Sequence, residues 1–183
     1  LSETLVAVDV VATATGETRR MTVAELRLGY RHSVLKRSDK YIVTRVGLQL
    51  EPQGQPSLRY PELRKEVSSK PLLTEVRTAV RRIRDRKSML AGGTDENRHS
   101  AGSFFTNPIV SSDVADAIDG PKYPADGGTK LSAAWLIEQA GFHKGWGEGP
   151  AGLSTRHTLA IVNRGGARAT DILDVARMVR DGV

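Results

Sequence analysis

The chain has 183 residues, and its 27 lysines and arginines against 21 acidic residues give a formal net charge of +6. This length fits one large domain or one domain with part of a second, and the positive charge favours an anionic partner. Because the chain has no cysteine, a disulfide framework, a thiolate nucleophile and a cysteine-ligated metal are excluded.

The first elements in the chain have the pattern of a β-hairpin. In Thr4–Ala12 the even positions from 6 to 12 are apolar and Asp9 is polar. This alternation predicts a strand whose even positions line one face, with Asp9 on the other. A Thr-Gly-Glu turn at 15–17 then leads into a second arm over 18–23.

A short helix and a third strand follow the hairpin. We expect the helix over 23–28 to end at Gly29, in the left-handed conformation that glycine favours. Residues 41–50 alternate clearly and predict a strand. The segment 51–56 has two prolines and one glycine and no apolar period, so we predict a linker and a domain boundary there.

An amphipathic helix is predicted from Leu72 to Lys87. Apolar residues from Leu72 to Ile83 recur at spacings of four, four and three. The opposite face carries six cations, Arg77, Arg81, Arg82, Arg84, Arg86 and Lys87. Two interpretations stay open, a solvated helix face and a surface that binds an anion or a nucleic acid.

The rest of the chain is richer in helix. A polar and flexible segment is predicted over 91–100, and a helix over 130–140 is expected to end at Gly141. A short apolar strand covers 158–162, and Thr170 is expected to cap a last helix that ends before Gly182. The overall prediction is an α+β fold.

Several kinds of site and location are disfavoured by the sequence. The four histidines lack metal-ligand spacing, which predicts no metal site. Neither a Walker A sequence nor a GxGxxG turn after a strand is present. No segment reaches the roughly 20 apolar residues needed to span a bilayer, and the chain does not begin with a secretory signal, so we expect a cytoplasmic protein.

Two polar clusters could carry chemistry. Gly29–Ser33 places a tyrosine hydroxyl and a guanidinium side by side, a pair suited to an anion. In Gly102–Pro108, Ser103 lacks the Gly-x-Ser-x-Gly context of an acyl-transfer nucleophile but could still donate a proton. From the spacing alone, a partly buried Tyr30 is as compatible with the sequence as an anion-binding one. For residues 102–108 the spacing favours a structural turn over a functional site.

The sequence resembles the second half of the UDP-N-acetylenolpyruvoylglucosamine reductase family. The resemblance lies in five segments, 28–36, 102–110, 123–127, 130–141 and 153–163. It implies that residues 1–54 are the C-terminal strands of an FAD-binding domain. Residues 55–183 would then be a mixed α/β substrate-binding domain, incomplete at its C-terminus.

The resemblance also implies an activity and a set of site residues. In this family NADPH, acting through FAD, reduces the enolpyruvyl group of UDP-N-acetylglucosamine-enolpyruvate to give UDP-N-acetylmuramate for peptidoglycan. Ser103 corresponds to the proton donor and Tyr30 to a tyrosine that closes over the substrate diphosphate. The other implied substrate-binding residues are Lys87, Asn107, Tyr123, Lys130 and His157.

Part of the family's catalytic apparatus has no counterpart in these residues. The Gly-Ser-Asn flavin loop, a catalytic arginine and a glutamate on the last strand are expected to lie outside residues 1–183. We therefore expect these residues alone neither to hold FAD tightly nor to be active. The alternative hypothesis is a non-catalytic module that binds anions or nucleic acid through the helix 77–87.

Overall fold

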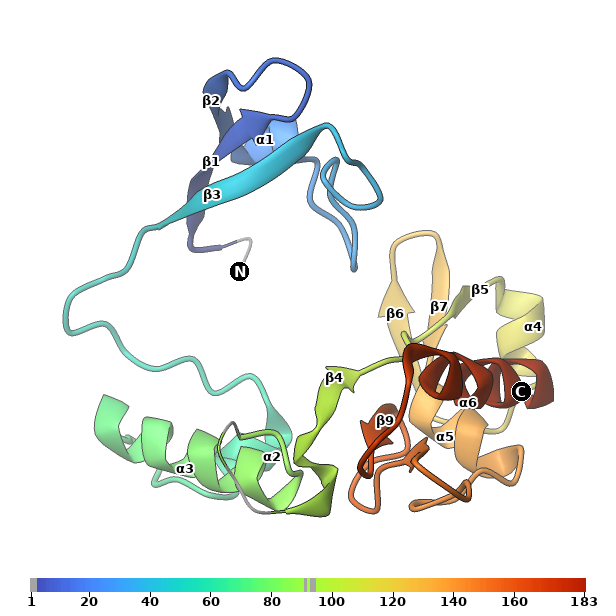
Figure 1. Ribbon diagram of the computed structural model, residues 1–183. Helices are drawn as coiled ribbons and strands as arrows, with labels where there is room; N and C mark the ends of the chain where they lie inside the picture. Colours follow the sequence, from blue (N-terminus) through green and yellow to red (C-terminus); the bar gives the residue numbers. More distant parts are fainter. Residues whose placement is uncertain (1–2, 91, 93–94) are drawn as a thin grey trace. The chain divides into compact units, whose positions relative to one another are not determined.

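The computed structural model describes residues 3–90, 92 and 95–183 (Figure 1). The chain forms two compact units, Leu1–Pro56 and Ser57–Val183. The mixture of helices and strands confirms the predicted α+β class. The assignment of residues 1–54 to a flavin domain and of 55–183 to a substrate domain stays a prediction. None of the described helices is long and apolar enough to cross a membrane.

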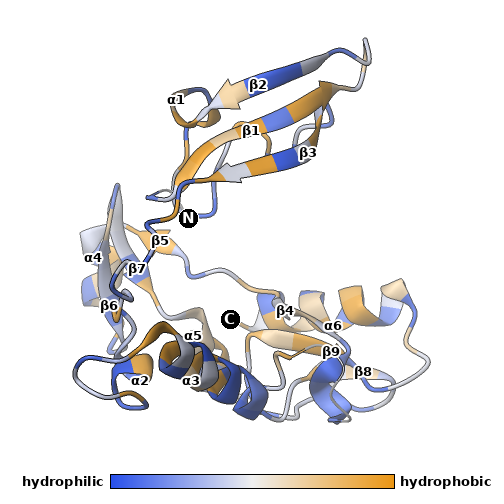
Figure 2. Ribbon diagram, turned by 90° about the vertical axis from the view of Figure 1, so that its left-hand side faces the viewer, coloured by the Kyte–Doolittle hydropathy of each residue, from blue (hydrophilic) through white to orange (hydrophobic). Residues whose placement is uncertain are grey.

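The first unit is built on the predicted hairpin and third strand. β1 (Leu5–Ala12), β2 (Thr18–Thr22) and β3 (Tyr41–Leu48) form an antiparallel sheet in the order β2-β1-β3. Figure 2 shows β1 as hydrophobic along most of its length. The core of the first unit consists of Leu5, Val8, Val10, Met21 and Leu26.

The buried face of β1 differs from the predicted one at its start. Val6 is 49% exposed, whereas Leu5 and Ala7 are buried. The pairing of β1 with β3 shifts register between Leu5 and Ala7, and such a bulge reverses the alternation of side chains. The prediction that Val6 shares one face with Val8 and Val10 was therefore wrong.

The short helix of the first unit ends earlier than predicted. α1 (Val23–Leu26) has a capping box, in which the side chains of Thr22 and Glu25 each accept the other's backbone N–H. Arg27, with φ 46°, takes the left-handed position that the sequence assigned to Gly29. The Leu26 carbonyl accepts the Val34 N–H, which anchors the chain at the end of this helix.

The second unit contains the remaining elements. Its helices are α2 (Pro61–Arg64), α3 (Leu73–Arg86), the 3₁₀ helix η1 (Glu96–Arg98), α4 (Ser112–Asp116), α5 (Ala133–Gln139) and α6 (Ala169–Gly182). Its strands are β4 (Ser100–Ser103), β5 (Ile109–Val110), β6 (Lys122–Ala125), β7 (Gly128–Leu131), β8 (Ala151–Leu153) and β9 (Ala160–Asn163). They form two antiparallel sheets, β4-β9-β8 and β5-β7-β6.

The main core of the second unit lies where α5 and α6 meet β8 and β9. Its buried members are Ile137, Ala151, Leu153, Ile161, Val175, Ala176 and Val179. Phe105 and Trp146 pack against this cluster from the side. The core therefore fixes β9 and, through strand pairing, the neighbouring strand β4 that carries Ser103.

Three predicted boundaries in the second unit needed correction. Lys130 and Leu131 lie in β7, because both pair with β6, and the helix begins only after the N-cap Ser132. The last helix begins at Ala169, so Thr170 lies inside it rather than capping it, and Gly182 is its final residue. The first correction reflects strand pairing, a tertiary contact that a local pattern does not contain, and the start and end of α6 differ from the prediction by two residues and one residue, respectively.

The segment 91–100, predicted to be flexible, contains regular structure in its described part. Residues 91, 93 and 94 lie outside the described part of the chain. Residues 95–98 form the capped 3₁₀ helix η1, whose Asp95 side chain accepts the Asn97 N–H, and β4 begins at Ser100. Hydrogen bonds to a distant loop, described below, order these polar residues.

Candidate functional site

The basic face of α3 is partly neutralised within the second unit. The Glu66 carboxylate forms ion pairs with the guanidinium groups of Arg86, at 2.7 Å, and of Arg82, at 3.5 Å. The hydrogen bond from Arg86 holds the pKa of Glu66 below its usual value. Lys87, at the C-cap of α3, forms an ion pair with Glu62 of α2. These pairs favour a helix face that belongs to the fold over a surface built for a polyanion.

Ser103 ends β4 at a distorted position in the sheet. It pairs with Ala160 of β9, and Gly102 before it has φ 79° where the register shifts. The next residue, Phe104, donates its N–H to the Leu159 carbonyl at 2.7 Å. Among the described residues, none forms a hydrogen bond with the half-buried Ser103 hydroxyl. The hydroxyl is therefore available to a ligand.

His157 lies in the loop that leads into β9, next to the Ser103 segment. Its Nδ1 accepts the Leu159 N–H at 3.2 Å, which places the proton of the neutral ring on Nε2. Burial lowers the pKa of His157, and the charges of Lys87 and Lys144 lower it further, against a smaller opposite effect of Glu138. The ring is thus a neutral donor in surroundings made more positive by Lys87 and Lys144.

Lys144 is a member of this group that the sequence analysis missed. It lines a cavity of about 550 Å³ together with Glu138, Gly141 and His143. Glu138 accepts a hydrogen bond of 3.3 Å from Thr158, the residue after His157. No motif surrounds Lys144, so only the fold places it beside His157.

Three other predicted site residues cluster around the sheet β5-β7-β6. Asn107 Oδ1 accepts the N–H of Ala133 at 3.0 Å, in the first turn of α5. Tyr123 and Lys130 are cross-strand partners, and the Lys130 ammonium lies 5.9 Å from the centre of the Tyr123 ring. Pro108 accepts the N–H of Leu131, which holds the Asn107 segment against β7.

Tyr30 belongs to the first unit, whereas the other six predicted site residues belong to the second. Gly29 and His32 exchange two backbone hydrogen bonds, of 3.1 and 3.2 Å, around a tight turn. Arg31 has φ 52° there, and its carbonyl accepts Lys36 Nζ at 2.6 Å. This turn presents Tyr30 with 48% of its surface exposed.

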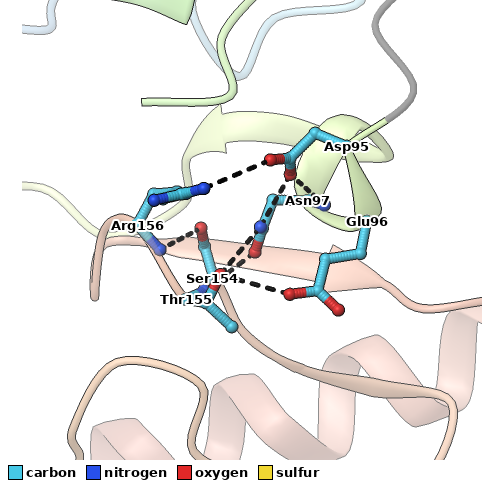
Figure 3. Close-up of polar contacts among 6 residues, drawn as sticks. All are labelled: Asp95, Glu96, Asn97, Ser154, Thr155 and Arg156. Atoms are coloured by element: carbon cyan, nitrogen blue, oxygen red, sulfur yellow. Dashed lines mark hydrogen bonds and ion pairs between the residues drawn. The ribbon is translucent and has the colours of Figure 1, made fainter. Parts of the chain in front are cut away.

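A buried polar network, the Asn97 network, connects the segment before β4 to the segment before His157 (Figure 3). Asn97 is only 2% exposed, and its Oδ1 accepts the Thr155 N–H at 2.8 Å. Its Nδ2 donates to Thr155 Oγ1 at 2.9 Å and to Asp95 Oδ1 at 2.7 Å. Hydrogen bonds from Asn97 also hold the pKa of Asp95 below its usual value.

Comparison with known proteins gives consistent results. Residues 94–183 match the family model described as UDP-N-acetylenolpyruvoylglucosamine reductase, C-terminal domain. The reductase of Nocardia farcinica is 47% identical over 202 residues, which cover this whole chain and 53% of that protein. The reductase of Mycobacterium tuberculosis (strain H37Rv) is 43% identical over 205 residues, which cover this whole chain and 56% of that protein.

A solved structure agrees with these relatives. The crystal structure of the Thermus caldophilus reductase matches with a TM-score of 0.59 and 28% identity, covering this whole chain and 50% of that one. The chain resembles the C-terminal half of this reductase family over its whole length. The resemblance expected from the sequence is therefore confirmed. The chain spans about half the length of the curated relatives it matches.

The reductase match and the predicted site overlap in sequence. The predicted residues inside the matched segment 94–183 are Ser103, Asn107, Tyr123, Lys130 and His157. Lys87 and Tyr30 precede it and are covered by the full-length relatives. The individual roles of these residues stay predictions.

The low pKa of His157 predicts a pH effect on stability. The pKa in the folded protein lies below the ordinary 6.5, so the unfolded chain binds this proton more readily. The contribution is therefore complete above about pH 6.5 and is lost as the pH falls from there through the folded pKa. We expect H157Q to reduce this loss, as measured by urea unfolding between about pH 8 and about pH 5.

The matched control for this experiment is H99Q, which removes an exposed imidazole from the same unit. Stability curves of H157Q and of the unsubstituted protein with the same slope below about pH 6.5 would contradict the prediction.

Proposed function

We propose that this chain is the substrate-binding and proton-donating part of a flavoprotein reductase. The reaction is the NADPH-dependent reduction of UDP-N-acetylglucosamine-enolpyruvate to UDP-N-acetylmuramate for peptidoglycan synthesis. The observation that carries the proposal is the Ser103 hydroxyl, which forms no hydrogen bond with another described residue. It lies next to the loop of His157, whose surroundings include the positive charges of Lys87 and Lys144. The similarity to reductases of the same name supports it.

In this proposal, FAD supplies the hydride. The described residues of this chain do not form a cradle for its phosphates, which in proteins is usually a glycine-rich turn before a helix. The Gly165-Gly166 turn before α6 has this form, but the N–H groups of Gly165 and Ala167 already donate to Asn163 Oδ1, at 2.8 and 3.2 Å. We therefore assign flavin binding to other parts of the longer protein.

The cations of the second unit fit the anionic parts of the substrate. Lys87 and Lys144 both lie close enough to His157 to affect its pKa. A diphosphate bound between them would receive charge-assisted hydrogen bonds from both lysines and a neutral one from His157 Nε2. Because Lys87 is paired with Glu62, the diphosphate has to share or replace that carboxylate.

Ser103 Oγ is assigned the proton transfer. Hydride addition to one carbon of the enolpyruvyl double bond leaves an enolate-like charge on the carbon that carries the carboxylate. A hydroxyl donates its proton to that carbon and is left as an alkoxide. A serine is a weak acid, so the transfer requires this strongly basic carbon and hydrogen-bond donors around Oγ.

Ligand preference tests the proposed function against the alternative. We expect the full-length protein to bind UDP-N-acetylglucosamine-enolpyruvate in preference to a random DNA duplex, at both low and high salt. K87Q should weaken binding of the nucleotide sugar about tenfold, because a charge-assisted contact is lost. The matched variant R77Q removes an exposed charge from the same helix and should have no effect.

The alternative hypothesis, a module that binds polyanions through α3, predicts the opposite pattern. Duplex binding would dominate, fall steeply with salt and weaken in R77Q. That result would overturn the proposed function.

A further inference from the structure

The glycine-rich loop between α5 and β8 is organised by one arginine. Gly145, Gly147 and Gly149 all have positive φ in this loop. The Arg164 guanidinium, which follows β9, reaches across and donates to backbone carbonyls. Its partners are the carbonyl oxygens of Gly147, of Gly145 at 2.8 Å, of Trp146 at 3.3 Å and of Leu153 at 3.4 Å.

The guanidinium also occupies space that a side chain would otherwise take. A Cβ atom added to Gly152 would lie 2.3 Å from Arg164 Nη2 and 2.5 Å from Cζ. The Arg164 N–H donates to the Pro150 carbonyl at 2.8 Å, which brings its backbone against the same loop. Arginine suits this position because its planar fork offers several donors in fixed directions.

The loop held in this way begins with Lys144. The Gly145 N–H donates to the Ser154 carbonyl at 3.1 Å, and the Leu153 N–H donates to the Trp146 carbonyl at 2.8 Å. The residue before Gly145 is therefore fixed against the segment that continues into His157. Lys144 and Glu138 line the same cavity, and Glu138 is bonded to the residue after His157.

We propose that Arg164 is a positioning residue, which holds Lys144 beside His157 by bonding the carbonyl oxygens of the loop Gly145–Gly147. The placement of Lys144 rests on the contacts above. Only its consequence, tighter binding of a diphosphate, rests on the proposed function.

Titration of His157 by NMR tests the placement without any substrate. K144Q is expected to raise the pKa of His157, because a neighbouring positive charge is removed. R164K keeps the charge at position 164 but lacks the planar fork of five donors that makes the four carbonyl contacts, and it should raise the same pKa. The double variant R164K/K144Q should show no further rise beyond K144Q.

Amide hydrogen exchange gives a second readout of the same loop. In R164K the N–H groups of Gly145 and Leu153 should exchange about tenfold faster or more, because the loop opens more easily. R177Q, which removes an exposed arginine of α6 paired with Asp174, is the matched control and should change neither readout.

Two results would overturn the proposal. One is a rise of the His157 pKa in K144Q but not in R164K, which would show that Arg164 does not position Lys144. The other is no rise in K144Q, which would show that Lys144 is not beside His157. R164Q removes the charge as well and is the stronger perturbation. If R164Q does not fold, the result of R164K alone decides the role of Arg164.

The full-length protein connects this placement to the proposed function. R164K should raise the KM for the nucleotide sugar about tenfold with kcat nearly unchanged, because substrate binding and not chemistry is affected. A protein that does not turn this substrate over would contradict the proposed function, while the titration and exchange results would still decide the role of Arg164.

Discussion

Replacing Ser103 by alanine in the full-length protein is expected to separate the two halves of the proposed reaction. Reduction of bound flavin by NADPH should proceed at nearly the original rate, because it requires no proton from Ser103. Reoxidation by the enolpyruvyl substrate should slow by several orders of magnitude, because the substrate carbon loses its proton donor. Stopped-flow flavin absorbance measures the two rates separately.

The control for this prediction is S100A, at the other end of β4. Ser100 accepts the Gly102 N–H at 3.3 Å, so its hydroxyl has a role in the strand itself. S100A should leave both half-reactions nearly unchanged. If S103A slows both half-reactions equally, Ser103 has a structural role and the proton comes from elsewhere.

Local patterns were sufficient to predict the three strands of the first unit. β1 and β3 are eight residues long, which is enough for a period of two to stand out, and both were found where expected. The exposed Val6 was not predicted, because a bulge depends on the partner strand and not on β1 alone.

Local patterns were less informative in the second unit. β5 has two residues and β6 and β7 have four each, too few for an alternation to be recognised. Lys130 was placed in a helix because the apolar period of α5 extends back to it, whereas pairing with Tyr123 holds it in β7. Tertiary pairing decided between the two conformations.

The site shows the same division between local and distant information. The segments with family motifs drew attention to Ser103, Asn107 and His157, and the resemblance they indicated is confirmed. Asn97 and Lys144 were missed because their roles depend on contacts between segments far apart in sequence. Asn97 and Thr155, for example, are 58 residues apart.

Replacing Asn97 by alanine is expected to destabilise the second unit by about 2–4 kcal/mol. The substitution leaves the Thr155 N–H without its acceptor and removes both donors of the Asn97 amide. The buried Asn97 side chain makes all three of these hydrogen bonds, and they are lost together, which is why this effect exceeds that of an ordinary hydrogen bond. Urea unfolding of N97A and of the unsubstituted protein gives the difference.

The Asn97 network should matter for geometry as well as for stability, because it connects the Ser103 strand to the His157 loop. N163A is a matched control, since Asn163 Oδ1 accepts two N–H groups but only within its own turn. N163A should reduce the free energy of unfolding by about 1 kcal/mol and leave the Thr155 amide protected from exchange.

A second variant, T155V, keeps the N–H bond to Asn97 and loses the hydroxyl, so its loss of stability should be a part of that of N97A. The double variant N97A/T155V should lose less stability than the sum of the two single losses. If N97A costs no more than N163A, the buried amide is not what holds the Ser103 strand against the His157 loop.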